Sequence, residues 1–251
     1  MSEQTPLTYH LNPGPVRSSD RVSLRLQLTA MAAFIFGYIL LPAVFSLILP
    51  PDSAVSGIAA ACGPILSLVM LFVLTNRYSG SFRKTMLILG FRRFPLKTMY
   101  LGLFIALGIM IMGGRVTLVW GIIAEFFSIE LGTPPTVAAA MSENIWDVAA
   151  LLITALAAAP VFEEVFFRRV IFGSLRRFMP LLPAMAIASL AFSELHLSLL
   201  QLPGLLLIGW IWQSFYIRSQ TLWSSVILHF YNNLIAAVLL LMIRFMNLQT
   251  F

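Results

Sequence analysis

The chain has 251 residues, of which 59% are hydrophobic and 10% are charged. Soluble globular domains carry about a quarter charged residues, so this composition excludes an ordinary soluble protein and indicates an all-α, polytopic transmembrane bundle. The formal net charge is +6, but the basic residues lie at the ends of apolar segments and in short loops. That distribution sets membrane topology and argues against nucleic acid as a partner, leaving the lipid bilayer as the expected surroundings.

The N-terminal region and the cysteine content narrow the possibilities further. Cys62 is the single cysteine, so neither an intramolecular disulfide nor a cysteine-based metal site is expected. Residues 1–25 are polar and lack the basic start, apolar stretch and small-residue cleavage site of a signal peptide. We therefore expect a cytoplasmic tail over residues 1–25, followed by a single transmembrane domain over residues 26–251.

Apolar segments follow one another along the rest of the chain. A helix needs about 20 apolar residues to cross a bilayer. We expect seven spans, or eight if one long segment is broken, at about 26–49, 55–74, 99–126, 145–177, 181–200, 205–217 and 221–246. No internal repeat, linker or second domain is evident.

Two connecting segments predict the orientation in the membrane. Residues 76–97 contain six Lys or Arg residues and no acid, which places this loop in the cytoplasm by the positive-inside rule. Residues 125–147 contain four acids and no basic residue, so they belong on the opposite side. Arg244 fits the cytoplasmic side poorly if the last helix crosses once, which leaves the side of the C-terminus open. The expected location is a prokaryotic inner membrane with a cytoplasmic N-terminus.

Two adjacent carboxylates, Glu163 and Glu164, interrupt the apolar fourth span. A charged side chain at the bilayer centre costs about 2.5–3.5 kcal/mol on insertion scales, so a pair of them needs partners or a wet cavity. Glu164 and Arg168 are four residues apart and can form an ion pair within their helix. Glu163 points about 100° away from Glu164, which lets one carboxylate be structural while the other faces a cavity.

Other polar residues are expected at a similar depth. A helix rise of about 1.5 Å per residue places Glu163 and His196 roughly 22 Å from the cytoplasmic ends of their helices. The same rise places His229 and Asn233 about 12 and 18 Å from the cytoplasmic end of the last helix. Because they are four residues apart, they share one face of that helix. A lone intramembrane His or Asn is often only an interhelical hydrogen-bond partner, worth about 0.6 kcal/mol. The convergence of this many polar groups in one layer favours a functional site.

The chemistry of this set supports amide hydrolysis. A carboxylate and an imidazole together can activate water, and a second imidazole and an amide can donate hydrogen bonds to an oxyanion. No G-x-S-x-G or Cys–His nucleophile signature and no H-E-x-x-H zinc motif is present. Glu163, His196 and His229 can still form a three-ligand Zn²⁺ site with an open position for water, so a zinc mechanism stays open.

Three motifs occur in order along the chain: Glu163-Glu164-x-x-x-Arg168, Phe192-x-x-x-His196 and His229-x-x-x-Asn233. Over about residues 147–240 they resemble the motifs of the CAAX protease and bacteriocin-processing family (CPBP, also Abi) of intramembrane proteases. The resemblance implies a membrane fold of about eight helices and endopeptidase activity. It also implies a membrane-associated peptide or protein as the substrate, either prenylated or of the bacteriocin type.

The same resemblance implies roles for the individual residues. Glu163 would be the activating carboxylate, assisted by His196, while His229 and Asn233 would bind the oxyanion. Glu164 would act with them as part of the catalytic set.

Supporting roles and the metal question follow from the same motifs. Arg168 and Phe192 would support the catalytic set. We favour a metal-free mechanism that requires no cofactor, because the first motif supplies a base and the last an oxyanion hole. Glu194 and Arg115 are two further charges in apolar segments, and the motifs assign them no role.

Two other functions stay open at this point. One is a non-proteolytic membrane scaffold or bacteriocin-immunity protein on the same fold, which should keep its phenotype when Glu163 is replaced by Ala. The other is a proton-coupled transporter, in which the same Glu and His residues relay protons. Many transporters contain inverted repeats, and none is evident in this sequence.

Overall fold

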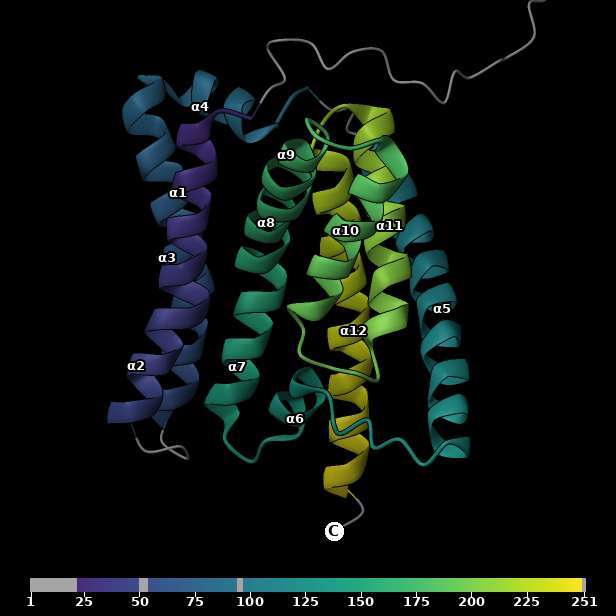
Figure 1. The fold of residues 1–251 in the computed structure, drawn as a ribbon. Coiled ribbons are helices and arrows are strands. Elements are labelled where there is room, and N and C mark those ends of the chain that lie inside the picture. Colours follow the sequence, from purple (N-terminus) through teal and green to yellow (C-terminus); the bar gives the residue numbers. More distant parts are fainter. Residues whose placement is uncertain (1–21, 50–53, 94–96, 250–251) are drawn as a thin grey trace, which may run out of the picture.

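The computed structural model describes residues 22–49, 54–93 and 97–249, and nearly all of them are helical (Figure 1). No strand occurs within these ranges, so the expected all-α class is confirmed. Most of the expected polar tail, residues 1–21, lies outside the described residues. The first helix begins at Leu24, where the hydroxyl oxygen of Ser23 accepts a hydrogen bond from the backbone N–H of Leu26 as an N-cap.

The elements follow in chain order, with η marking a π-helical segment. They are α1 (Leu24–Phe34), η2 (Ile35–Leu40), α2 (Leu41–Ile48), α3 (Ala54–Ser79), α4 (Phe82–Leu89), α5 (Lys97–Phe126), α6 (Pro135–Met141), α7 (Ile145–Ile153), η3 (Thr154–Ala158), α8 (Ala159–Glu164), η4 (Val165–Phe172), α9 (Gly173–Leu175), α10 (Leu181–Glu194), α11 (Leu202–Ser219) and α12 (Trp223–Gln249). The segments α7 to α9 form one continuous helical rod.

In the part of the chain that the structure describes, five helical segments are long and apolar enough to cross a membrane. They are Leu24–Ile48, Cys62–Ser79, Met99–Phe126, Ile145–Leu175 and Trp223–Met246. The expected number of seven to eight spans is not confirmed. The difference lies in the expected spans at 181–200 and 205–217.

These two expected spans form a helical hairpin whose turn lies part-way along the bundle (Figure 1). α10 has 14 residues and ends at Glu194, after which the N–H groups of His196 and Leu197 bond to carbonyls three residues earlier. Leu197 then takes a left-handed conformation (φ 48°), and Pro203 lies in the first turn of α11. Hydropathy continues through Leu200, but this backbone geometry ends the helix before it.

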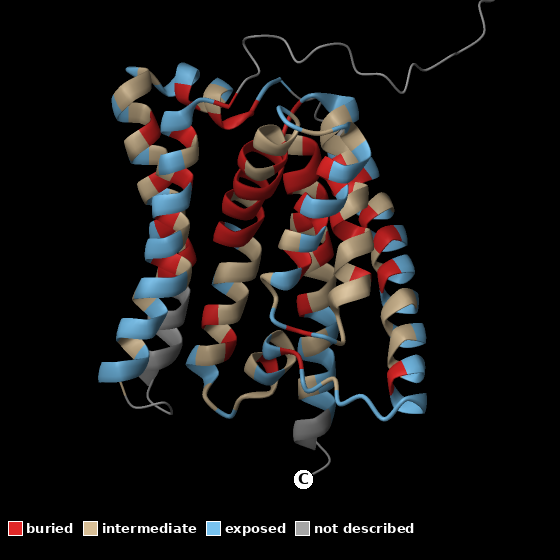
Figure 2. Cartoon of the chain, viewed as in Figure 1, coloured by how far each residue is buried: buried red, intermediate tan, exposed pale blue. Residues whose placement is uncertain are grey.

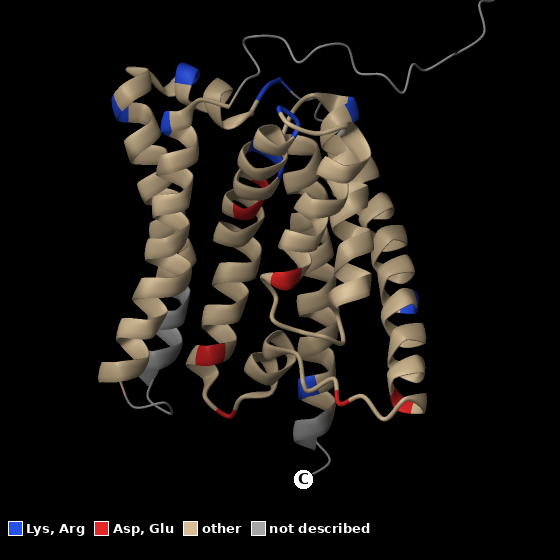
Figure 3. Cartoon of the chain, viewed as in Figure 1, with Lys and Arg blue, Asp and Glu red and all other residues tan. Residues whose placement is uncertain are grey.

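The charged residues separate toward the two ends of the bundle (Figure 3). Most Lys and Arg residues lie at the end where α1 begins, and α4 occupies the middle of the basic segment 76–97. The acidic segment 125–147 lies at the opposite end, where α6 is found. The C-terminal end of α12 lies at this acidic end too, where α12 contacts α6 (Figure 1).

Arg244 near the end of α12 has a structural partner on the acidic side. Its Nη1 donates hydrogen bonds to the carbonyl oxygens of Ala140, at 3.1 Å, and Ser142, at 2.5 Å. These carbonyls close α6, and basic side chains commonly bond to the last carbonyls of a helix. The position of Arg244 therefore reflects capping of α6, which explains why a basic residue lies at this end.

Burial is concentrated in the middle of the bundle, around α8 and η4 (Figure 2). From 158 to 170 each residue except Val161 is buried, including four charged side chains. The outward faces of α1, α3 and α5 instead expose large apolar residues, as a lipid-facing surface does. The rod α7–α9 thus carries the charges of the first motif through the best-protected part of the molecule.

Two prolines account for irregular turns in the helices beside this core. Pro42 follows η2 and Pro160 follows η3. Proline has no backbone N–H, so it cannot close the hydrogen-bond ladder on the preceding turn. π-Helical turns widen the helix there and re-aim the side chains that follow, which is common at functional sites.

Candidate active site

Glu164 is fully buried at the junction of α8 and η4, and both of its oxygens are engaged. Oε2 lies 3.0 Å from Nε of Arg168, so the expected ion pair within the helix is present, with both side chains 0% exposed. Oε1 accepts a hydrogen bond of 3.0 Å from Nδ1 of His229 on α12. Glu164 therefore ties the first motif to the last and has no free oxygen.

His229 lies between the two carboxylates of the first motif. Because the carboxylate of Glu164 can only accept, Nδ1 of His229 carries a hydrogen, and this contact sets the orientation of the ring. Nε2 then faces the other carboxylate, 4.0 Å from Oε2 of Glu163. The indole of Trp212 on α11 stacks on the imidazole with a centroid distance of 4.4 Å. The last motif thus presents one fixed nitrogen toward Glu163.

Glu163 differs from Glu164 in the distance to its charged partner, because its Oε2 lies 4.0 Å from His229, whereas Oε2 of Glu164 lies 3.0 Å from Arg168. Oε2 is buried and accepts no hydrogen bond in the described parts of the chain. Oε1 accepts a hydrogen bond of 3.3 Å from the hydroxyl of Tyr38 in η2. The two adjacent carboxylates are therefore divided as the helix geometry predicts, with Glu164 held on both sides and Glu163 left with a free oxygen.

Tyr38 is a site residue that the motifs did not indicate. It lies 125 residues before Glu163, in the first apolar span. The only signal in the sequence is a phenol hydroxyl within an apolar span, and Tyr is a common residue near membrane interfaces. No periodicity links the two positions, so only the folded structure brings them together.

His196 does not lie within a helix, which corrects the expectation that it belongs to a fifth span. It lies in the turn after α10, where its Nδ1 donates a hydrogen bond of 3.1 Å to the carbonyl oxygen of Phe192. The ring of Phe192 has edge contacts with both imidazoles, at 5.0 Å from His196 and 5.9 Å from His229. Phe192 therefore brings the second and third motifs together through one aromatic ring.

Arg168 packs on the aromatic residues of this region. Its guanidinium carbon lies 4.6 Å from the ring centroid of Phe192 and 5.8 Å from that of Trp212. Such cation–π contacts stabilise a buried guanidinium that has few hydrogen-bond partners. In the described residues, Nη1 and Nη2 of Arg168 have no hydrogen-bond partner, so Glu164 and these two rings are its main contacts.

Asn233 makes a contact that the motif did not predict. Its Nδ2 donates a hydrogen bond of 2.9 Å to the carbonyl oxygen of Ala155 in η3. In this segment the N–H of Ala159 bonds to Thr154, five residues earlier, and the next such donor would come from Pro160. Because proline has no N–H, the Ala155 carbonyl is left over, and Asn233 satisfies it. One amide hydrogen of Asn233 is therefore used structurally.

The remaining two intramembrane charges take no part in this cluster. Glu194, at the end of α10, and Arg115, in α5, are both exposed. They form no ion pair with each other in the described ranges. The structure thus separates them from the buried set around Glu164.

Glu163, His196 and His229 do not form a three-ligand metal site in the described part of the chain. Throughout the described residues, no group of three or more His, Cys, Asp or Glu side chains is placed to hold a metal ion. Protein contacts use Nδ1 of both histidines, which leaves Nε2 as the ring nitrogen that could still bind a metal. No step of the proposed reaction is routed through a metal, and the chelator experiment tests that choice.

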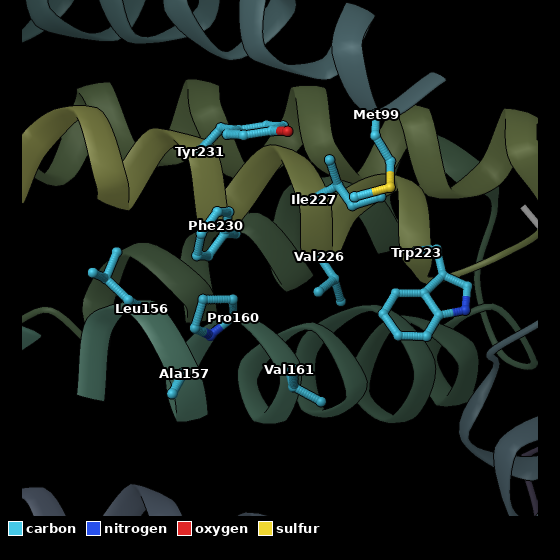
Figure 4. A pocket seen from close by; sticks show the side chains of 10 residues that line it. All are labelled: Met99, Leu156, Ala157, Pro160, Val161, Trp223, Val226, Ile227, Phe230 and Tyr231. Atoms are coloured by element: carbon cyan, nitrogen blue, oxygen red, sulfur yellow. The ribbon is translucent and has the colours of Figure 1, made fainter. Parts of the chain in front are cut away.

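An apolar pocket of about 250 Å³ lies between the rod at η3–α8, α12 and the beginning of α5 (Figure 4). Pro160 and Val161 line it from α8, and Val226, Phe230 and Tyr231 line it from α12. Pro160 precedes Glu163 by three residues, and Phe230 directly follows His229. The pocket thus shares its two main helices with the site.

The fold and these contacts define a helical, membrane-embedded protein with a buried carboxylate–imidazole site. Residues 144–235 match the family model of the type II CAAX prenyl endopeptidase Rce1-like proteins, which is consistent with the CPBP family. Each residue of the three motifs lies in the matched segment, and Tyr38 lies outside it. Comparisons with curated proteins and with solved structures give no significant match.

Proposed function

We propose that this protein is an intramembrane endopeptidase of the CAAX type, with Glu163 as the general base. The observation that carries the proposal is the buried Oε2 of Glu163, which accepts no hydrogen bond from the described residues and lies 4.0 Å from Nε2 of His229. Buried polar atoms are usually hydrogen-bonded, so a buried carboxylate oxygen without a hydrogen bond needs an explanation, and binding of a water molecule supplies one. The family match over residues 144–235 supports peptide hydrolysis as the reaction.

The proposed reaction begins with a water molecule held by Glu163 and His196. Nδ1–H of His196 is donated to a carbonyl, which leaves Nε2 with a lone pair that accepts a hydrogen bond from water. Oε2 of Glu163 takes one proton from this water as the water oxygen attacks the substrate carbonyl carbon. The carbonyl electron pair moves onto oxygen, giving a tetrahedral oxyanion.

His229 and Asn233 stabilise that oxyanion in the proposal. His229 donates from Nε2–H, and Asn233 donates the amide hydrogen that Ala155 does not use. Since Nδ1–H also bonds to Glu164, the donating imidazole carries a positive charge, which the Glu164 carboxylate balances. The intermediate collapses with cleavage of the C–N bond, and the proton held by Glu163 passes to the leaving amine.

Substrate class and orientation complete the proposal. The apolar pocket beside the site suits an apolar side chain or a lipid group of a membrane-associated peptide, prenylated or of the bacteriocin type. The α10–α11 hairpin enters the bilayer and returns to the same side, which places His196 in mid-membrane. The clustered Lys and Arg residues support a cytoplasmic side at the start of α1 in a prokaryotic inner membrane.

The experiment is cleavage of a quenched fluorescent peptide library by the full chain purified in detergent. Glu163→Gln removes the base but keeps the shape of the side chain, and Glu194→Gln removes an exposed carboxylate as the matched control. We expect Glu163→Gln to lose at least about 100-fold in kcat, because general-base catalysis contributes about 10²–10⁴. Glu194→Gln should stay within about threefold of wild type.

Two further arms separate the alternatives. The proposal predicts that a chelator leaves the activity unchanged, while loss of activity that Zn²⁺ restores contradicts the metal-free mechanism. A folded wild type that cleaves no peptide, together with a cellular phenotype that survives Glu163→Gln, favours the non-proteolytic scaffold. Peptide cleavage at the wild-type rate by Glu163→Gln overturns the assignment of the base.

A further inference from the structure

We infer that Tyr38 is a positioning residue for the carboxylate of Glu163, which makes the first helical segment part of the active site. The inference rests on the proposed role of Glu163 as the base. Its starting point is the hydrogen bond of 3.3 Å from the Tyr38 hydroxyl to Oε1 of Glu163. Across the described residues, this is the one hydrogen bond that the Glu163 carboxylate accepts.

The first helix is packed closely enough to hold Tyr38 in place. A Cβ built on Gly37 would collide with the Gly63 backbone and with Ser67, so the backbones of η2 and α3 are in close contact at this crossing. At the same crossing, the Ser67 hydroxyl donates a hydrogen bond of 2.8 Å to the carbonyl oxygen of Ala33. Small residues and such hydrogen bonds are what fix helix pairs inside membranes. The position of η2 on α3 is therefore well determined next to Tyr38.

An aromatic stack then joins η2 to the helix that carries Glu163. Phe34 stacks on Phe166 at 4.6 Å, Tyr38 stacks on Phe162 at 5.3 Å, and Phe34 and Tyr38 stack on each other at 5.2 Å. Phe162 directly precedes Glu163 in α8. The four rings hold the Tyr38 ring independently of its hydroxyl, so Tyr38→Phe keeps the packing and removes only the hydrogen bond.

The chemical effect of this hydrogen bond is on the orientation of the base. With Oε1 bound to the Tyr38 hydroxyl, rotation of the carboxylate is restricted and Oε2 stays directed toward Nε2 of His229. Oε2 is then the oxygen that accepts the proton from water. Tyr38 acts through Glu163 and not on the substrate, so its loss should lower kcat and leave KM unchanged.

The chain provides a matched control for the loss of a tyrosine hydroxyl. The hydroxyl of Tyr78, near the end of α3, is buried and has no hydrogen-bond partner in the described ranges. Tyr78→Phe therefore makes the same chemical change without touching Glu163. Phe34→Leu is the second control, because it weakens the aromatic stack and keeps the Tyr38 hydroxyl.

The kinetic test compares these variants with wild type and Glu163→Gln on one cleaved peptide. Tyr38→Phe should lose about tenfold in kcat with KM unchanged, because the carboxylate of Glu163 is no longer held in one orientation. Loss of a hydrogen bond to a charged group also lowers stability, so kcat is measured well below the thermal midpoint of each variant. Tyr78→Phe should stay within about twofold of wild type. In the Glu163→Gln background, Tyr38→Phe should cause no further loss, because both changes act on one carboxylate.

The outcomes for the inference and for the proposed function are distinguishable. If Tyr38→Phe keeps the wild-type kcat while Glu163→Gln is inactive, the inference about Tyr38 is overturned and the proposed function stands. The same holds if Tyr78→Phe loses as much kcat as Tyr38→Phe, or if unfolding of Tyr38→Phe at the assay temperature explains its loss of kcat. Full activity of Glu163→Gln overturns the proposed function. The infrared carboxylate band of Glu163 tests the contact with Tyr38 without catalysis, and the difference spectrum between wild type and Glu163→Gln isolates this band. The band should shift in Tyr38→Phe and not in Tyr78→Phe. An unshifted band in Tyr38→Phe overturns the inference.

Discussion

Removing the positive partner of Glu164 should strongly destabilise the protein. Arg168 and Glu164 are 3.0 Å apart, and both side chains are 0% exposed. Arg168→Met keeps much of the side-chain length on the rings of Phe192 and Trp212 but leaves the buried Glu164 carboxylate without the guanidinium that balances its charge. Breaking a buried pair in this way costs about 3–5 kcal/mol, because one charge is left uncompensated.

The size of this effect can be read from thermal unfolding in detergent. For a chain of this length, each kcal/mol shifts the midpoint by about 2–4 °C, so Arg168→Met should lower the midpoint by roughly 6–20 °C. The double variant Glu164→Gln/Arg168→Met should recover most of that loss, since no unpaired charge remains. It should still be inactive, because the neutral amide introduced by Glu164→Gln can neither balance a charged imidazole nor fix the His229 ring as a carboxylate does.

This pairing of results separates stability from chemistry. A midpoint of Arg168→Met within about 2 °C of wild type contradicts the reasoning, because it means that Glu164 does not depend on Arg168. A double variant as unstable as the single one also contradicts it. Recovery of both stability and activity in the double variant refutes the role given to Glu164 in orienting His229.

Three further predictions concern contacts around the site. Asn233→Ala leaves the Ala155 carbonyl without a donor and should cost about 1–3 kcal/mol of unfolding free energy. The double variant Pro160→Ala/Asn233→Ala should be less destabilised, because the new backbone N–H at position 160 can bond to this carbonyl. An equal or larger loss in the double variant contradicts the role given to Pro160 in freeing the carbonyl. Arg244→Met removes the cap of α6 and should lower stability by about 1 kcal/mol with kcat unchanged, whereas a loss of kcat points to a role beyond capping. Ala157→Phe fills part of the apolar pocket and should raise KM about tenfold for a lipid-modified peptide but not for its unmodified form; equal effects on both argue against lipid binding there.

The parts of the site that could be predicted from sequence are those set by helix periodicity. Four-residue spacing within one helix predicted the Glu164–Arg168 pair, and rise per residue predicted that Glu163 and His229 lie in the same layer of the bundle, within about 10 Å of depth. Both are local rules that hold in any regular helix. Long apolar segments likewise predicted the spans that the structure contains.

The parts that could not be predicted depend on contacts between distant segments or on where a helix ends. Hydropathy continues past Glu194, so nothing in the composition indicated that α10 ends there and that His196 lies in a turn. The Tyr38 contact spans 125 residues. The bond from Asn233 to Ala155 arises from a carbonyl that Pro160 frees on another helix, and a motif read along one helix cannot show it.

The most direct test of the account is the rate at which Glu163→Gln cleaves a peptide that the wild type cleaves. Both proteins are measured in the same detergent, with the cut site identified by mass spectrometry and folding checked by the thermal midpoint. The account predicts a folded variant whose kcat is reduced at least about 100-fold, since its base is gone. A folded Glu163→Gln that cuts the same bond within about threefold of the wild-type rate contradicts the assignment of Glu163 as the general base.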